Sequence, residues 1–191
     1  YLGSAPALRR FAGDGMVAKI TTQFPSTTAA HVTAIHTGLP PGASGVFEWF
    51  YYEPQLDAII APLLFSFAGD HERDTLKRVG ARASTLYPTA TLYQELKSQG
   101  VASGVFQHAS YAFSPYTKQV IDGAQLHSYR TLPEALVNMT GWLGRQQGPR
   151  YAFLYFDAID ATCHRYGPES PQVAAEITLF LAALEQLLLP A

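Results

Sequence analysis

The stretch YAFLYF, residues 151–156, is an unbroken run of apolar and aromatic side chains. A short run of this kind is typical of a strand in a parallel sheet that helices cover on both faces. A helix signal lies on either side of it. Thr131 and Glu134 have the spacing of a capping box with Pro133 in the first turn, and Ser170 followed by Pro171 opens a last helix. Together these signals predict an α/β fold with a mostly parallel central sheet.

Outward from this strand, helix-like and strand-like segments alternate along the chain. Helices are expected at Ser4–Phe11, Thr27–Thr37 and Thr89–Ser98, and strands at Met16–Thr22, Phe47–Tyr52 and Val101–His108. Ala58–Phe67 could be strand or loop. The last helix should bury one face, made of Val173, Ile177, Phe180, Leu181, Leu184 and Leu188. We expect a single α/β domain over residues 1–191.

The composition is that of a globular protein. The hydrophobic fraction is 48%, the charged fraction is 15% and the net charge is -2. This charge argues against a protein that coats a nucleic-acid polymer, but it is compatible with a small phosphorylated substrate, because bound metal ions can supply local positive charge. The single cysteine, Cys163, excludes an intramolecular disulfide. The longest apolar run, residues 58–68, is interrupted by Pro62 and Ser66 and is too short for a membrane segment.

Both ends of the chain are abrupt. It begins at Tyr1 rather than at Met, and it stops at Ala191 directly after an apolar helix face. We therefore expect both ends to be cut relative to a natural chain. No signal peptide is visible. The compartment and the oligomeric state stay undetermined, with a soluble, cytoplasmic protein as the working expectation.

Polar residues follow the strand at 151–156, where ligands bind in parallel α/β folds. Asp160 and His164 are four residues apart, and a carboxylate and an imidazole are both good zinc ligands. The two side chains could converge on one metal ion. Alternatively, Asp160 caps a turn and His164 is an ordinary surface residue.

A second polar segment, FPSTTAAH at residues 24–31, precedes a helix. A hydroxyl at a helix start lies among free backbone N–H groups at the positive end of the helix dipole, which favours anions. A threonine there could attack phosphorus if a metal lowers the pKa of its hydroxyl. Ser26, Thr27 and Thr28 are also good N-cap residues, so capping alone would explain them.

Taken together, the two segments resemble the type I phosphodiesterase/nucleotide pyrophosphatase family of the alkaline phosphatase superfamily. The resemblance rests on FPSTTAAHVTAIHTGLPPGASGV at residues 24–46 and on YFDAIDATCHRYGPES at residues 155–170. Counting back nine positions from Thr37, in the Thr-Gly-Leu turn, places the family's nucleophile on Thr28. The second segment places the family's metal-binding Asp and His on Asp160 and His164.

The resemblance implies an alkaline-phosphatase-like three-layer sandwich that is incomplete at both ends. It implies two divalent metal ions, usually zinc, that flank the phosphate. Thr28, bound to one of them, would attack and form a phospho-threonine, and Asp160 and His164 would hold part of the other. The substrate would be a phosphodiester or a nucleotide pyrophosphate. The alternatives are a phosphomonoesterase or phosphonate hydrolase of the same superfamily, or a truncated domain that is inactive as given.

The sequence departs from the family in two respects. The family needs a further Asp before Tyr1, and an Asp-His-Gly segment and another His after the last helix; these are missing, so the metals could be partial or absent in this chain. Asp70 and His71 do not replace them, because Gly69-Asp70 indicates a polar turn. In nucleotide pyrophosphatases an Asn three residues after the nucleophile holds a phosphate oxygen. Here that position is His31, which could donate to the same oxygen as a catalytic residue or could face a neighbouring strand.

The aromatic residues after the nucleophile segment leave two interpretations open. Trp49, Phe50, Tyr51 and Tyr52 could form a wall for a leaving group, or they could pack in the core.

Overall fold

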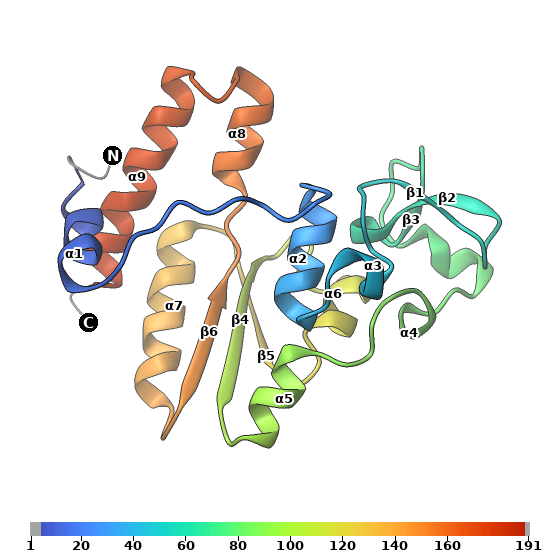
Figure 1. The fold of residues 1–191 in the computed structure, drawn as a ribbon, viewed down its shortest axis with the longest axis horizontal. Coiled ribbons are helices and arrows are strands. Elements are labelled where there is room, and N and C mark those ends of the chain that lie inside the picture. The colour runs from blue at the N-terminus through green and yellow to red at the C-terminus, as the bar shows by residue number, and fades with distance from the viewer. Residues whose placement is uncertain (1–4, 190–191) are drawn as a thin grey trace.

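The computed structural model describes residues 5–189, and its centre is a parallel sheet (Figure 1). The sheet has the order β5-β4-β6, with β4 at Ala102–His108, β5 at Gln125–Tyr129 and β6 at Arg150–Leu154. Val105 of β4 is in register with Leu126 and with Phe153, and both pairings are parallel. The predicted parallel α/β sheet is therefore confirmed.

Successive residues of β4 point to opposite faces of the sheet, and they are buried on both faces. Helices therefore cover both faces. Val105 belongs to a first hydrophobic cluster that includes Val32 of α2 (Thr28–Thr37) and Tyr93 of α5 (Leu92–Ser98). Phe106 belongs to a second cluster with α7 (Leu132–Arg145), and α9 (Pro171–Leu187) packs outside α7. The result is a three-layer arrangement in which the parallel sheet lies between two layers of helices.

One close approach shapes the second cluster. A side chain at Gly104 of β4 would place its Cβ 3.1 Å from the ring of Trp142, so glycine lets the indole lie directly on the sheet. The indole Nε1 then donates to Oε1 of Gln125, on the neighbouring strand, at 2.8 Å. Glycine at position 104 thus determines how α7 docks.

A second, antiparallel sheet lies apart from the first, on the right of Figure 1. It has the order β1-β2-β3, with β1 at Tyr51–Glu53, β2 at Ala58–Ala61 and β3 at Ser66–Phe67. The ambiguous segment Ala58–Phe67 is therefore two strands, with a 3-10 turn at Pro62–Leu64 between them. The strand expected at Phe47–Tyr52 begins only at Tyr51.

The remaining helices are short. They are α1 (Pro6–Asp14), α3 (Pro41–Ser44), a 3-10 helix at Thr75–Val79, α4 (Ala83–Leu86), α6 (Pro115–Val120) and α8 (Ala158–Tyr166). The helix expected at Ser4–Phe11 corresponds to α1, although Ser4 lies outside the described residues. None of the helices in residues 5–189 is both long and apolar enough to cross a membrane.

The strand expected at Met16–Thr22 is wrong. This segment is extended, but it is paired with no described strand, and Figure 1 shows it running from α1 toward α2 across the sheet rather than beside it. Met16 is 91% exposed and Ile20 is 85% exposed. The propensity of such residues for strands reflects packing on a pleated neighbour, and no strand among the described residues supplies one here.

Two burial expectations also need correction. The strand at 151–156 was expected to be covered on both faces, yet β6 is the edge strand of the described sheet and its residues are only partly buried. In α9, Val173 is the one fully buried residue of the described helix. Leu184 contacts the second cluster from a half-buried position, and Phe180 stacks on Phe156 with the ring centroids 5.2 Å apart.

Candidate functional site

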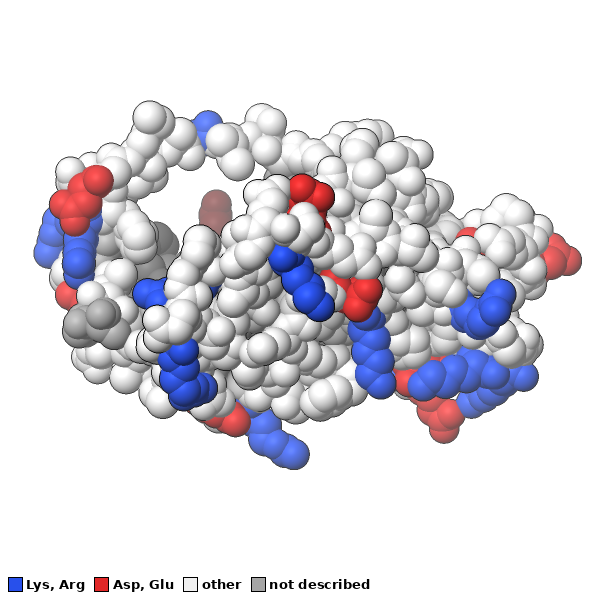
Figure 2. Space-filling view, turned by 90° about the horizontal axis from the view of Figure 1, so that it is seen from below, with Lys and Arg blue, Asp and Glu red and all other residues white. Residues whose placement is uncertain are grey.

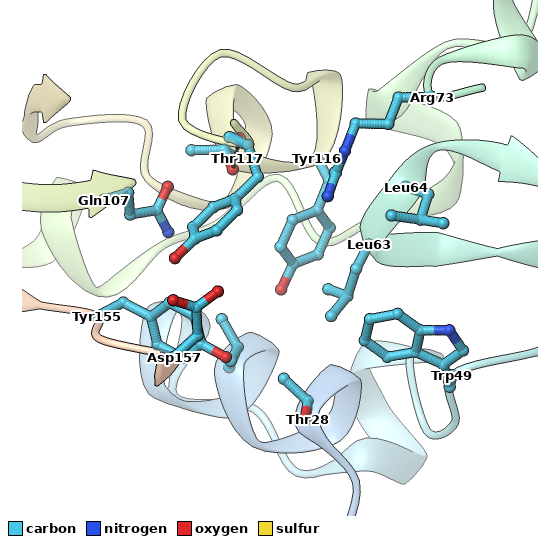
Figure 3. Close-up of a pocket in the computed structure, with 12 residues that line it drawn as sticks. Thr28, Trp49, Leu63, Leu64, Arg73, Gln107, Tyr116, Thr117, Tyr155 and Asp157 are labelled. Atoms are coloured by element: carbon cyan, nitrogen blue, oxygen red, sulfur yellow. Dashed lines mark hydrogen bonds between the residues drawn. The ribbon is translucent and has the colours of Figure 1, made fainter. Parts of the chain in front are cut away.

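A cavity of about 130 Å³ lies at the carboxyl ends of β4 and β6 (Figure 3). Gln107 comes from β4, Asp157 follows β6, and Thr28 is the first residue of α2. This is the position that the rule for parallel α/β sheets predicts. The full lining is Thr28, Val32, Trp49, Leu63, Leu64, Arg73, Gln107, Tyr111, Tyr116, Thr117, Tyr155 and Asp157.

Thr27 and Thr28 have different roles at the start of α2. Thr27 is the N-cap: its Oγ1 accepts from the N–H of Ala30 at 3.3 Å and donates to the carbonyl of Phe47 at 3.2 Å. Thr28 lines the cavity, and its hydroxyl has no hydrogen-bond partner among the described residues. Capping is therefore complete without Thr28, whose hydroxyl is left at the positive end of the helix.

Buried polar links fix α2, and with it Thr28. The Thr33 hydroxyl is 2.8 Å from the hydroxyl of Tyr116, and Nδ1 of His36 is 2.7 Å from the hydroxyl of Tyr93. The helix ends at Gly38, which takes the left-handed conformation with φ 72°. These contacts hold the helix at both of its flanks, so the position of Thr28 is set by the core.

Asp157 is one of the cavity residues that the sequence analysis did not single out. It is the N-cap residue of α8, but its side chain makes no capping hydrogen bond and lines the cavity instead. Burial, and after it the charge of Asp157, raises the pKa of Tyr111 and of Tyr155 above the ordinary value for a phenol. The first polar residue after a buried strand was the signal that could have identified it.

Gln107 adds a polar group that the protein itself leaves without a partner. Its side chain is 3% exposed, and its Oε1 is buried with no hydrogen-bond partner among the described residues. In Figure 3 it points from β4 toward the cavity that Thr28 and Asp157 also line. A buried amide without a partner costs free energy, which a polar ligand in the cavity would recover.

Asp160 and His164 lie together, as their spacing predicts. They are one turn apart on α8, with 3.6 Å between Oδ2 of Asp160 and Nε2 of His164. Their side chains are 63% and 81% exposed, and neither lines the cavity that contains Thr28. The structure thus brings the Asp–His pair together but not with the expected nucleophile.

His31 and the aromatic segment take mixed positions. His31 lies half-buried on α2, outside the cavity lining, and its Nε2 is buried without a described partner. Trp49 lines the cavity, as one interpretation of the aromatic run required. Tyr51 is buried in the first cluster, where burial raises its pKa to about 12, and Phe50 and Tyr52 are exposed.

The described donors fit a two-metal centre only in part. No group of three or more His, Cys, Asp or Glu side chains in residues 5–189 is arranged to hold a metal ion. Asp160 with His164 offers two ligand atoms on α8, and Asp157 with Thr28 offers oxygens in the cavity. A closed zinc shell takes about four ligands, so each of these pairs supplies part of one.

Charges are mixed on the face of the molecule drawn in Figure 2, where basic and acidic side chains are interspersed. This face has no broad basic area of the kind that binds a nucleic-acid backbone.

Comparison with known proteins places the chain in a family. The sequence profile of the type I phosphodiesterase/nucleotide pyrophosphatase family matches residues 1–188, and the chain belongs to this family. A search of curated proteins finds no match.

Solved structures of the same fold include two enzymes. One is murine ectonucleotide pyrophosphatase/phosphodiesterase 5, an inactive variant in complex with AMP, with TM-score 0.68 and 17% identity over 96% of this chain and 46% of that chain. Another is phosphonoacetate hydrolase from Sinorhizobium meliloti in complex with phosphonoformate, with TM-score 0.61 and 17% identity over 95% of this chain and 47% of that chain. The chain spans about half the length of these structures.

Proposed function

We propose that this chain carries the nucleophile portion of a phosphoric ester hydrolase that cleaves phosphodiester or nucleotide pyrophosphate bonds. The observation that supports it most is the Thr28 hydroxyl, free of capping duty and placed in a cavity at the positive end of α2. Membership in the type I phosphodiesterase/nucleotide pyrophosphatase family supports the same reaction class.

In the proposed reaction, Oγ1 of Thr28 attacks phosphorus and the bond from phosphorus to the leaving oxygen breaks. The threonine proton passes to a base, for which Asp157 is the carboxylate in the cavity. The free N–H groups at the start of α2 stabilise negative charge on the phosphoryl oxygens. Water then cleaves the phospho-threonine, which frees Thr28 and releases the second product.

The negative charge of Asp157 would repel a phosphate, so this end of the cavity calls for a compensating cation. We propose that two divalent metal ions, zinc by family resemblance, serve the whole site and supply this charge when bound. Thr28 would contribute an oxygen ligand to one ion, and Asp160 with His164 would hold part of the other. These side chains do not complete the coordination of two ions by themselves.

A phosphomonoesterase or phosphonate hydrolase is the second candidate, because these enzymes share the site and differ in what surrounds the leaving group. Rates on 4-nitrophenyl phosphate and on bis(4-nitrophenyl) phosphate distinguish the two. A clear preference for the diester supports the first function, and a preference for the monoester supports the second.

The test of the nucleophile is Thr28→Ala. Because Thr27 is the cap, this change leaves the start of α2 intact, and turnover of an aryl phosphodiester should fall on the order of a thousandfold or more. Ser26→Ala removes an exposed hydroxyl two residues away and should leave the rate unchanged. Acid-quenched wild-type protein should carry one phosphoryl group on Thr28 by mass spectrometry, and the alanine variant should not. Normal turnover in Thr28→Ala would refute the proposal.

A further inference from the structure

Among the described residues, Arg73 is the one basic side chain that lines the cavity. Figure 3 shows it entering from the opposite side to Thr28, with its guanidinium pointing toward the middle of the cavity beside Tyr116. No described residue forms an ion pair or a side-chain hydrogen bond with it. An arginine that faces a cavity in this way is a candidate for binding an anion.

The surrounding loop accounts for why Arg73 is unpaired. Both charged neighbours that could neutralise it are already engaged: Glu72 Oε2 is 2.7 Å from Arg78, and Asp74 Oδ2 is 2.6 Å from Lys77. Arg78 also lies 3.7 Å from Asp70. All three carboxylates of the loop are therefore paired with other cations, and the charge of Arg73 is left for the cavity.

The backbone on both sides of Arg73 is held in place. The carbonyl of Glu72 accepts from the Ser66 hydroxyl at 2.8 Å, and the N–H of Asp74 donates to the carbonyl of Leu64 at 3.0 Å. Asp74 itself takes a left-handed conformation, with φ 67°, that non-glycine residues seldom adopt. The loop is thus anchored to the antiparallel sheet, and the guanidinium extends from a fixed base.

We propose that Arg73 binds a second anionic group of the substrate, at the opposite side of the cavity from the phosphorus that Thr28 attacks. The inference rests on the proposed hydrolase function of the same cavity and names its substrate class: compact phosphorus esters or phosphonates that carry a second phosphate or a carboxylate. Gln107 also lines the cavity, and the Nε2 of its amide is a donor that could bind an oxygen of such a ligand. Leu63 and Trp49 line the cavity with apolar surface, so a ligand can make polar contacts mainly on the side of Thr28 and on the side of Arg73.

The test uses two aryl diesters that differ by one carboxylate, 4-nitrophenyl methyl phosphate and 4-nitrophenyl carboxymethyl phosphate. The wild type should have the higher kcat/KM on the carboxymethyl ester. Arg73→Gln should reduce the ratio of the two values by about tenfold or more, because a charge-assisted hydrogen bond is lost. Arg73→Lys should retain part of the ratio. Arg82→Gln, the same charge change at an exposed position outside the cavity, should not alter it.

Equilibrium binding of phosphonoacetate and methylphosphonate, measured by calorimetry, separates this inference from the proposed function. Suppose that the wild type hydrolyses neither ester but binds phosphonoacetate more tightly than methylphosphonate, and that Arg73→Gln abolishes this preference. The hydrolase function then fails and the role of Arg73 stands. If the esters are hydrolysed and Arg73→Gln leaves both the kinetic and the binding preference intact, the role of Arg73 is overturned and the hydrolase function stands. An equal loss on both esters, or no preference in the wild type, also overturns it.

Discussion

The buried side chain of His36 both helps to position the site and makes the stability of the fold depend on pH. His36 is completely buried between α2 and the sheet, where Nδ1 contacts the Tyr93 hydroxyl and the ring packs edge-on against Phe153. Burial lowers the pKa of His36 to about 4, from an ordinary value of 6.5. The folded protein therefore keeps this imidazole neutral well into the acid range.

A pH dependence of unfolding follows from this shift. Between pH 6.5 and about 4 the unfolded chain binds a proton at His36 that the folded chain does not. The free energy of unfolding therefore decreases as the pH is lowered through this range, by up to about 3 kcal/mol in total. His36→Gln, which keeps a hydrogen-bonding side chain but does not titrate, should flatten this part of the curve in urea titrations at a series of pH values. His71→Gln, at an exposed site, should not. Identical slopes for the wild type and His36→Gln would contradict the assignment.

At the scale of elements, two helices begin with the same local device in different surroundings. Thr91 with Gln94 caps α5, and Thr131 with Glu134 caps α7, each by a capping box. Thr131 is exposed and only caps. Thr91 is buried, and its hydroxyl also donates to the carbonyl of Asp122 at 2.5 Å, which ties α5 to the turn before β5.

The two caps should therefore differ in how much they stabilise the fold. Thr131→Ala should lower the free energy of unfolding by about 1 kcal/mol, the usual value of an N-cap. Thr91→Ala should cost about 1 kcal/mol more, because it removes a second hydrogen bond in a part-buried position. Thr→Ser at each position retains the hydroxyl and serves as the control. Chemical denaturation measures all four, and equal costs for the two alanine variants would contradict the expected difference.

At the scale of the whole molecule, β4 belongs to both hydrophobic clusters, since Val105 faces one and Phe106 the other. The clusters should then unfold together. Each cluster contains or adjoins one of the two tryptophans: Trp142 lies in the second, and Trp49 lines the cavity beside the first.

Leu76→Ala, in the first cluster, tests this coupling in a Trp49→Phe background in which Trp142 alone reports on the second. The change should cost about 2–5 kcal/mol and shift the Trp142 fluorescence transition together with the far-UV circular dichroism transition. Val79→Ala, 57% exposed on the same 3-10 helix, should change stability little. A Trp142 transition that stays in place while the circular dichroism becomes biphasic would show that the clusters are independent.

The sequence predicted those elements whose signals are local. The caps at Thr27, Thr131 and Ser170 and the glycine after α2 mark helix ends to within a few residues, because a cap satisfies backbone groups only a few positions away. β5, with the sequence QLHSY, was missed because its mixed polar residues show neither an apolar run nor a clean alternation. It forms a strand because β4 lies beside it.

The site could be predicted only as separate segments. Thr28 was identifiable from its motif, as were Asp160 and His164, and their catalytic and metal-binding roles stay predictions. Asp157 and Arg73 were not identified, because a cavity is defined by which segments meet in space, and the loop that carries Arg73 reaches Thr28 only through the antiparallel sheet. The sequence pattern alone does not predict which distant segments come together to line the cavity.

The contact of the Trp142 ring with Gly104 has an evolutionary consequence. Interiors are close-packed, so a side chain at position 104 would need the space that the indole fills, and a smaller residue at position 142 would leave a void above the glycine. Neither position can drift by itself without loss of packing. Across the lineage of this chain, Gly104 and Trp142 should thus be inherited and replaced as a pair.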